Sequence, residues 1–177
     1  THKTLRGPRA ALIFSKKVSA PPLFVRVTVG EGNSSVKQGL RLDQLIDKAV
    51  FPGLQGGPHL NQTAAVTVAL KEADSAEFRK YAKQVIKNTK TLAIELARLG
   101  WRLVSGGTDS HLILLDTWLG GKGISGKTAS EALEREGIIV NKNAIPFDTR
   151  SPVDPSGIRL GTAAETTRGK KEKDMKK

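Results

Sequence analysis

Cysteine is absent from the 177 residues of this chain, and methionine and tyrosine occur once each. The absence of cysteine excludes a disulfide framework, a cysteine nucleophile and a thiolate metal site. No apolar run has the length of a membrane span, and no signal-peptide pattern opens the sequence. We expect no metal site, since no metal-ligand spacing links the three histidines. A cytoplasmic location, or the mitochondrial matrix, is consistent with these features.

Positive charge is plentiful, with a formal net charge of +12, but it is unevenly distributed. The first 17 residues contribute +5 and the last ten contribute +4. A basic chain suggests a nucleic-acid partner, yet no aromatic cluster interleaves with the basic runs to stack bases. We interpret both ends as solvated basic segments. A basic nucleic-acid-binding module stays an alternative, which a steep salt dependence of RNA or DNA affinity would support.

Hydrophobic residues make up 38% of the sequence, which is enough for a core. Their pattern along the chain predicts an α/β fold. Expected strands are residues 10–15, 23–29, 101–105, 111–118, 138–140 and 157–160, and residues 30–35 are expected to form a loop. Expected helices are residues 40–50, 58–99, 128–136 and 172–177. The long helical region carries one apolar stripe at spacings of three and four, formed by Phe78, Ala82, Val85, Thr89, Leu92, Ala93 and Leu96.

Capping residues mark the ends of these helices. Ser75 is expected to start a new helix after a break at Asp74, and Gly100 to end it. Thr128 and Glu131 have capping-box spacing, with Gly137 as the stop.

Three short motifs carry possible chemistry. Lys3 lies just before a Gly-Pro turn, and nearby cations or burial can turn a lysine into a nucleophile by lowering its pKa. The Gly56-Gly57-Pro58 sequence precedes a helix, where free N–H groups suit a phosphate. Arg159 stands among small residues, so its guanidinium can fork onto a carboxylate. The plainer alternatives are a surface lysine, a simple turn and a strand-end ion pair.

Residues 121–128 match the P-loop pattern, with Lys127 for the phosphates and Thr128 for magnesium. Against a P-loop, no later apolar strand ends in an aspartate suited to hold the metal. The remaining chain is also too short for a doubly wound sheet. We therefore interpret this stretch as a glycine-rich linker into a capped helix. A P-loop nucleotide-binding fragment stays an alternative, which ATP protection of Lys127 would support.

Several of these motifs, taken together and in order, resemble serine hydroxymethyltransferases, which are pyridoxal-phosphate enzymes of the aspartate-aminotransferase-like fold type I. The resemblance rests on residues 1–9, 46–58, 141–146, 151–152 and 156–162. It implies the C-terminal part of such an enzyme. Residues 1–74 would end the large cofactor domain, with an unusual insertion at 18–44. Residues 75–177 would hold a long connecting helix and a truncated small α/β C-terminal domain.

The resemblance also assigns roles to individual residues. It implies that Lys3 is the Schiff-base lysine for pyridoxal 5'-phosphate, with His2 and Arg9 beside the cofactor. It implies that Gly56 and Gly57 bind the cofactor phosphate of a neighbouring subunit, and hence a homodimer or tetramer. Arg159 would bind the carboxylate of serine or glycine, and the tetrahydrofolate contacts would be Asn143, Arg150, Ser151 and Pro152.

The implied reaction is reversible transfer of a one-carbon unit between serine and tetrahydrofolate, giving glycine. The family's ring-nitrogen partner, ring-stacking histidine and acid/base glutamate would all lie before Thr1. The only methionine is Met175, and the chain opens inside a motif. We therefore expect a fragment that does not turn over serine at a useful rate on its own.

Overall fold

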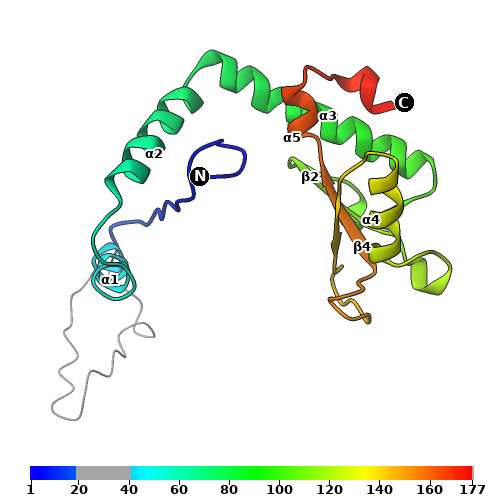
Figure 1. Cartoon of the computed structure of the whole chain (residues 1–177), viewed down its shortest axis with the longest axis horizontal. Coiled ribbons are helices and arrows are strands. Elements are labelled where there is room, and N and C mark those ends of the chain that lie inside the picture. The colour runs from blue at the N-terminus through cyan, green and yellow to red at the C-terminus, as the bar shows by residue number, and fades with distance from the viewer. Residues whose placement is uncertain (19–40, 177) are drawn as a thin grey trace, which may run out of the picture. The chain divides into compact units, whose positions relative to one another are not determined.

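The computed structural model describes residues 1–18 and 41–176. The chain divides into two compact units, Thr1–Ala73 and Asp74–Lys177 (Figure 1). The strand and loop expected at residues 23–35 lie outside the described residues, as does most of the insertion expected at 18–44. None of the described helices is both long enough and apolar enough to cross a membrane.

The first unit contains helices α1 (Leu42–Val50) and α2 (Leu60–Ala73). The backbone N–H of Arg41 donates to Oε1 of Gln44 at 3.1 Å and starts α1, so the helix expected at residues 40–50 is confirmed where it is described. Helix α2 begins two residues later than expected. The carbonyl of His59 accepts the first helical hydrogen bond, from Gln62 at 2.9 Å, so Pro58 precedes the helix instead of opening it.

The strand expected at residues 10–15 is absent, and the prediction was wrong. Leu12, Ile13 and Phe14 are 44%, 63% and 88% exposed, although three consecutive apolar residues are typical of a buried strand. A strand needs a neighbour to complete its hydrogen bonds. None of the residues that the structure describes forms a ladder with this segment.

The second unit is built on a four-stranded antiparallel sheet in the order β1-β2-β4-β3. The strands are β1 (Arg102–Leu103), β2 (Leu112–Asp116), β3 (Asn141–Asn143) and β4 (Gly157–Gly161). Strand β4 pairs with β2 on one side and with β3 on the other, so its residues have neighbours on both sides. A 3-10 turn follows β1 at Val104–Gly106, and another lies at Leu119–Gly121.

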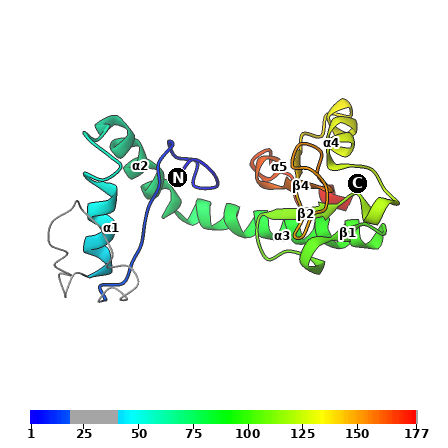
Figure 2. The ribbon, with the colours of Figure 1, turned by 90° about the horizontal axis from the view of Figure 1, so that it is seen from below.

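Helices α3 (Ala76–Arg98) and α4 (Gly126–Arg135) cover one face of this sheet. Their small residues Ala93 and Ala129 belong to the same core cluster, together with Leu103, Ile113, Leu115 and Ile158. Figure 2 shows α3 running alongside β1 and β2. Side chains alternate between the faces of a strand, so the other face carries the register neighbours Leu114 and Arg159.

The long helical region breaks where the sequence predicted. The Oγ of Ser75 accepts from the N–H of Phe78 at 3.0 Å and caps α3, and Gly100 ends it with a φ of +88°. The apolar stripe of α3 faces the core, with Val85, Thr89 and Ala93 buried. The predicted apolar stripe on this helix is therefore confirmed.

Helix α4 is capped by a different residue from the one predicted. The Oγ of Ser125 accepts from the N–H of Thr128 at 3.2 Å, so the capping box of Thr128 with Glu131 was wrong. Thr128 already lies in the first helical turn. Gly137, with a φ of +77°, follows the end of the helix as expected.

The strand expected at residues 138–140 is displaced to β3, where Asn141 pairs with Arg159. Ile139 is 85% exposed, because the apolar run precedes the ladder and does not join it. Helix α5 (Ala163–Thr167) was not predicted from the sequence. The last element is a 3-10 helix, η4 (Glu172–Lys176), where an α-helix was expected.

Candidate functional site

The candidate residues fall into two groups, one in each unit. Lys3, His2, Arg9, Gly56 and Gly57 lie in the first unit. The second unit holds the residues expected to contact substrate and folate, which are Asn143, Arg150, Ser151, Pro152 and Arg159.

Lys3 lies on a closed turn at the start of the first unit. Its carbonyl accepts from the N–H of Arg6 at 2.9 Å, and the carbonyl of Thr1 accepts from Gly7 at 2.9 Å. The Lys3 side chain is exposed, and its amine makes no hydrogen bond or ion pair with any residue in the described part of the chain. The turn therefore leaves the amine accessible to a reactant.

Gly7 allows this turn to pack against α2. A Cβ at Gly7 would lie 3.0 Å from the Cβ of Ala69, which is only 5% exposed, and 3.2 Å from the Cβ of Thr1. The Oγ1 of Thr1 donates to the carbonyl of Pro8 at 2.6 Å and closes the turn from the other side. The glycine in this motif therefore has a packing role, since it lets the lysine turn approach the helix closely.

The environment of Lys3 is electropositive. The pKa of His2 is lowered by desolvation and then by the charges of the Thr1 nitrogen, Arg9 and Lys3. Charges that disfavour a protonated imidazole favour an anion at the same place. An anionic cofactor is therefore electrostatically compatible with this turn.

Gly56 and Gly57 behave differently from Gly7. A Cβ at either position would meet no atom within 4 Å, so packing among the described residues does not require glycine there. The hydrogen bonds of the first turn of α2 begin at the carbonyl of His59, after the two glycines. Gly56 and Gly57 themselves border open space.

Arg159 lies on the sheet face opposite the helices. It is aligned with Leu114 of β2 and Asn141 of β3, and its Nε donates to Oδ1 of Asn141 at 3.2 Å. No carboxylate pairs with Arg159 among the described residues, so the strand-end ion pair that the sequence left open is not found there. The terminal nitrogens of the guanidinium are left for a ligand.

A buried polar network fixes the end of β4 against α3. The Oγ1 atoms of Thr89 and Thr162 lie 2.7 Å apart, and Thr162 also donates to the carbonyl of Val85 at 3.0 Å. The Nδ2 of Asn88 donates to Oγ1 of Thr166 and to the carbonyl of Lys170, both at 2.9 Å. Because Asn88 and Thr89 are fully buried, these bonds hold the segment after Arg159 firmly.

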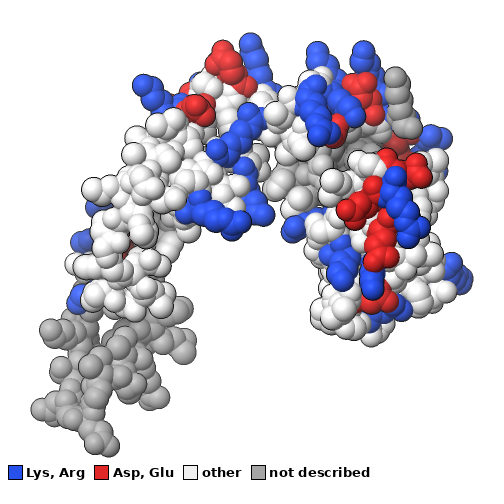
Figure 3. All heavy atoms as spheres, in the orientation of Figure 1, with Lys and Arg blue, Asp and Glu red and all other residues white. Residues whose placement is uncertain are grey.

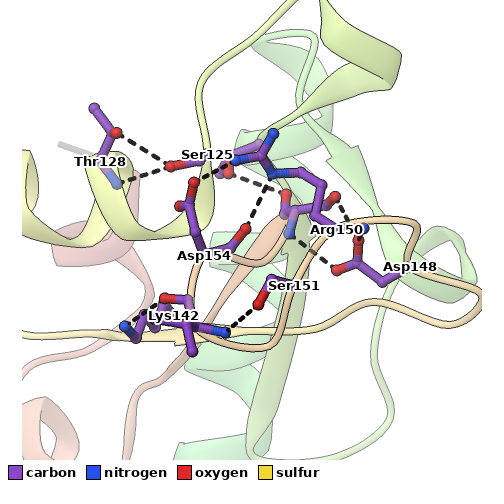
Figure 4. A network of polar contacts seen from close by, with 10 residues as sticks. Ser125, Thr128, Lys142, Asp148, Arg150, Ser151 and Asp154 are labelled. Atoms are coloured by element: carbon purple, nitrogen blue, oxygen red, sulfur yellow. Dashed lines mark hydrogen bonds and ion pairs between the residues drawn. The ribbon is translucent and has the colours of Figure 1, made fainter.

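Of the expected folate residues, Asn143 ends β3, and Arg150, Ser151 and Pro152 lie in the connection between β3 and β4. Figure 4 shows Arg150 and Ser151 there. The guanidinium of Arg150 pairs with the carboxylate of Asp154 and lies 4.0 Å from the ring centroid of Trp118. The Oγ of Ser151 accepts from the N–H of Val153 at 3.3 Å, while Pro152 is exposed. Asn143 uses its Nδ2 on the carbonyl of Ala144 at 2.7 Å.

Sequence reasoning missed two residues that organise this region, Asn141 and Asp148. Asp148 accepts hydrogen bonds from Ile145, Arg150 and Ser156. Burial raises its pKa, but these hydrogen bonds outweigh burial and lower the pKa of Asp148 to about 2. An aspartate among prolines and serines suggests a turn, but that signal does not reveal partners eight residues away.

The glycine-rich loop before α4 does not form a phosphate cradle. The N–H groups of Gly123 and Ile124 donate to the carbonyls of Trp118 and Thr117 at 2.9 Å, and that of Gly126 to Pro155 at 2.7 Å. A P-loop needs such amides free for the ligand. The sheet beside it is antiparallel, and Lys127 and Thr128 simply begin α4. The P-loop alternative therefore has no support.

The basic C-terminal residues are partly neutralised. Glu165 pairs with Arg168 and Lys170, each at 2.6 Å, and lysines and acids are interspersed on the visible face of the second unit (Figure 3). Within the described ranges, no group of three or more histidine, aspartate or glutamate side chains could hold a metal ion.

Comparison with known proteins shows which family this chain resembles. The family model described as serine hydroxymethyltransferase matches residues 1–177. A serine hydroxymethyltransferase of Acidothermus cellulolyticus is 50% identical over 176 residues, which cover 99% of this chain and 35% of that protein. One of Sorangium cellulosum is 49% identical over 169 residues, covering 96% of this chain and 34% of that protein. One of Desulfotalea psychrophila is 48% identical over 175 residues, with coverage of 99% and 35%. The chain spans about a third of the length of these relatives.

Proposed function

The chain belongs to the serine hydroxymethyltransferase family, and on that basis we propose that it forms part of a pyridoxal-phosphate-dependent transferase. The enzyme transfers a one-carbon unit reversibly between serine and tetrahydrofolate and gives glycine. The observation that carries the proposal is the accessible Lys3 amine on a closed, electropositive turn, in a chain that matches the family along its whole length. A cytoplasmic or mitochondrial-matrix location is expected for such an enzyme.

Within such an enzyme we place the chain in the C-terminal part of the fold. Residues 1–74 then end the large cofactor domain, and residues 75–177 form the connecting helix α3 and the small domain. The separation of the two compact units between Ala73 and Asp74 supports this division. The Ser75 cap supports it further, because α3 starts as an independent helix at the boundary.

The residues of the first unit suit pyridoxal phosphate. Lys3 supplies the primary amine that would hold the cofactor covalently, and His2 and Arg9 lie in the same positive field, which favours the phosphate. When bound, the cofactor supplies an electron sink for the carbanion formed at the substrate. Gly56 and Gly57 border open space, so they can approach the cofactor phosphate of a neighbouring subunit in a homodimer or tetramer.

Arg159 binds the carboxylate of serine or glycine. The hydrogen bond from Nε to Asn141 orients the guanidinium, and the terminal nitrogens then present two parallel donors. Neighbouring β2 and the Thr162 network keep β4 in place. Arg159 therefore holds the substrate by its carboxylate at a fixed position on β4.

Reduced folate contacts Asn143 and the segment of Arg150, Ser151 and Pro152. The Arg150 guanidinium is already held by Asp154 and Trp118, so this side chain meets the folate from a preset position. The exposed Pro152 and the turn at Ser151 provide surface without large side chains. No specific observation favours a second function.

The Arg159→Lys variant of the full-length gene product tests the substrate role. Lysine keeps the charge but cannot form the two parallel hydrogen bonds of a guanidinium. Loss of such a contact costs about 1.5–3 kcal/mol, so serine affinity should fall by roughly ten- to a hundred-fold. Cofactor affinity should change much less, because Lys3, Gly56 and Gly57 are untouched. Normal serine binding with loss of pyridoxal phosphate would show instead that Arg159 serves the cofactor.

A further inference from the structure

One carboxylate closes the connection between β3 and β4. Oδ2 of Asp148 accepts from the N–H of Ile145 at 3.2 Å and from the N–H of Ser156 at 2.9 Å. Oδ1 accepts from the N–H of Arg150 at 2.9 Å and from the Oγ of Ser156 at 2.7 Å. Asp148 therefore ties the beginning, the middle and the end of the connection together.

The anchoring points of Asp148 are themselves well fixed. Ser156 is 3% exposed, and its carbonyl accepts from the N–H of Thr117 at 2.9 Å. The next residue, Gly157, is aligned with Asn143 in the β3–β4 ladder. A Cβ at Gly157 would lie 2.6 Å from the carbonyl oxygen of Leu115, so this corner has no room to shift. Through Ser156, Asp148 links residues 149–155 to the rigid sheet.

The charge of Asp148 is stabilised by N–H and O–H dipoles and by no paired cation among the described residues. The guanidinium of Arg150, which lies in the same connection, pairs with Asp154. Hydrogen bonds to an ionised acceptor are about twice as strong as neutral ones. The hydrogen bonds to Asp148 are therefore stronger than the exposed hydrogen bond from Val153 to the Oγ of Ser151, and they contribute more to holding the loop in place.

We propose that Asp148 is a positioning residue whose carboxylate fixes the β3–β4 connection in the arrangement that presents Asn143 and Arg150 to reduced folate. This inference rests on the proposed function and deepens it. Asp148 itself does not touch the substrate. It sets folate affinity and leaves serine affinity nearly unchanged.

The separation of the two affinities follows from how Arg159 is held. Arg159 lies at the centre of β4, between ladder partners on β2 and β3. Beyond it, Thr162 is bonded to α3 through Thr89 and the carbonyl of Val85. None of these contacts passes through Asp148. Loosening the connection should therefore disturb the folate contacts and spare the carboxylate site.

The test uses the full-length gene product loaded with pyridoxal phosphate, and the variants Asp148→Asn and Asp148→Ala. The matched control is Asp174→Asn, because the carboxylate of Asp174 also accepts a backbone N–H, from Lys171 at 3.0 Å, at the other end of the small domain. Affinities for 5-formyltetrahydrofolate and for serine are measured by equilibrium titration. We expect folate affinity to fall by roughly ten-fold or more in both Asp148 variants, since charged hydrogen bonds are lost, and serine affinity to change by about two-fold or less.

Tryptophan fluorescence provides a second readout that does not depend on activity. The 177 residues include two tryptophans, of which Trp118 lies under the Arg150 guanidinium. The difference in emission between the full-length protein and its Trp118→Phe variant gives the emission of Trp118 alone. If Asp148 holds the loop, Asp148→Asn should change the Trp118 emission of the folded protein before any ligand is added. Asp174→Asn should not. This measurement remains informative if Asp148→Ala folds poorly.

Two results would overturn the inference. Wild-type folate affinity in Asp148→Asn would show that the loop does not need the carboxylate. An equal loss of serine and folate affinity would show that Asp148 only supports the whole domain. Failure of the wild-type protein to bind reduced folate would instead contradict the proposed function, and the wild-type titration separates these cases.

Discussion

The Nε of Arg159 donates a hydrogen bond to Oδ1 of Asn141 at 3.2 Å, across the antiparallel pairing that aligns the two residues. Both side chains lie on the sheet face that the helices leave uncovered. An arginine that uses only Nε in this way keeps its terminal nitrogens for a ligand. Asn141 therefore determines the direction in which the carboxylate-binding fork points.

Asn141→Ala should weaken serine binding without affecting the cofactor. Removing a neutral hydrogen bond costs about 0.5–1.5 kcal/mol, which corresponds to roughly a two- to ten-fold loss of serine affinity. Asn61→Ala, at an exposed position of α2, serves as the control and should change neither affinity. Calorimetric titration of the full-length protein would measure the effect, and an unchanged serine affinity would contradict the role of Asn141.

Asn88→Ala should destabilise the second unit. The side chain is fully buried, and its loss removes the partners of Thr166 and of the Lys170 carbonyl. An unsatisfied buried polar group costs about 1–3 kcal/mol. Both tryptophans of the 177-residue chain lie in this unit, so urea unfolding of that chain, followed by tryptophan fluorescence, reports the change. A free energy of unfolding equal to that of Asn61→Ala would show that the network contributes nothing.

Gly126→Ala should be far more damaging than Gly107→Ala. A Cβ at Gly126 would lie 2.0 Å from the carbonyl oxygen of Gly157, whereas a Cβ at Gly107 would meet nothing within 4 Å. Overpacking against backbone costs about 1–3 kcal/mol or more, because the strand or the helix must move. Thermal unfolding of both variants checks this. Similar melting temperatures would mean that α4 does not approach β4 as closely as these distances require.

The stabilising effect of Asp148 should depend on pH. Its pKa is lowered from 3.8 to about 2 in the folded chain, so its contribution is present above pH 3.8 and is lost as the pH falls toward 2. A pKa that is lower by one corresponds to about 1.4 kcal/mol, and partial exposure reduces this value, so we expect roughly 1–2 kcal/mol. The difference in unfolding free energy between wild type and Asp148→Asn should shrink over this range. A difference that stays constant from about pH 6 to about pH 2 would show that the ionised carboxylate does not stabilise the fold.

The sequence predicted the elements whose pattern involves only neighbouring residues and repeats over many of them. The helix α3 was predicted because its stripe repeats along the whole helix, and Ser75 and Gly100 mark its ends by capping chemistry alone. The antiparallel pair of β1 and β2 was predicted in the same way, since a glycine turn joins two apolar runs. These features need no knowledge of distant residues.

Features that depend on distant partners could not be predicted. The apolar segment at Leu12, Ile13 and Phe14 carries a strand pattern, but a ladder partner decides whether a strand forms. The strand β3 is polar, and only its pairing with β4, 16 to 18 residues ahead for Lys142 and Asn141, makes it a strand. The hydrogen bonds of Asn141 and Asp148 likewise depend on residues 18 and eight positions away. Lys3 and Arg159 were named because they lie in short motifs that can be read without such partners.

The attachment point of the cofactor tests the central claim most directly. Borohydride fixes pyridoxal phosphate to the amine that holds it, and peptide mapping of the treated full-length protein then identifies the lysine. We predict labelling of Lys3, with a Lys3→Arg variant as the unlabelled control. Labelling spread over Lys16, Lys17 and the C-terminal lysines, with Lys3 unmarked, would contradict the assignment of Lys3 as the cofactor lysine.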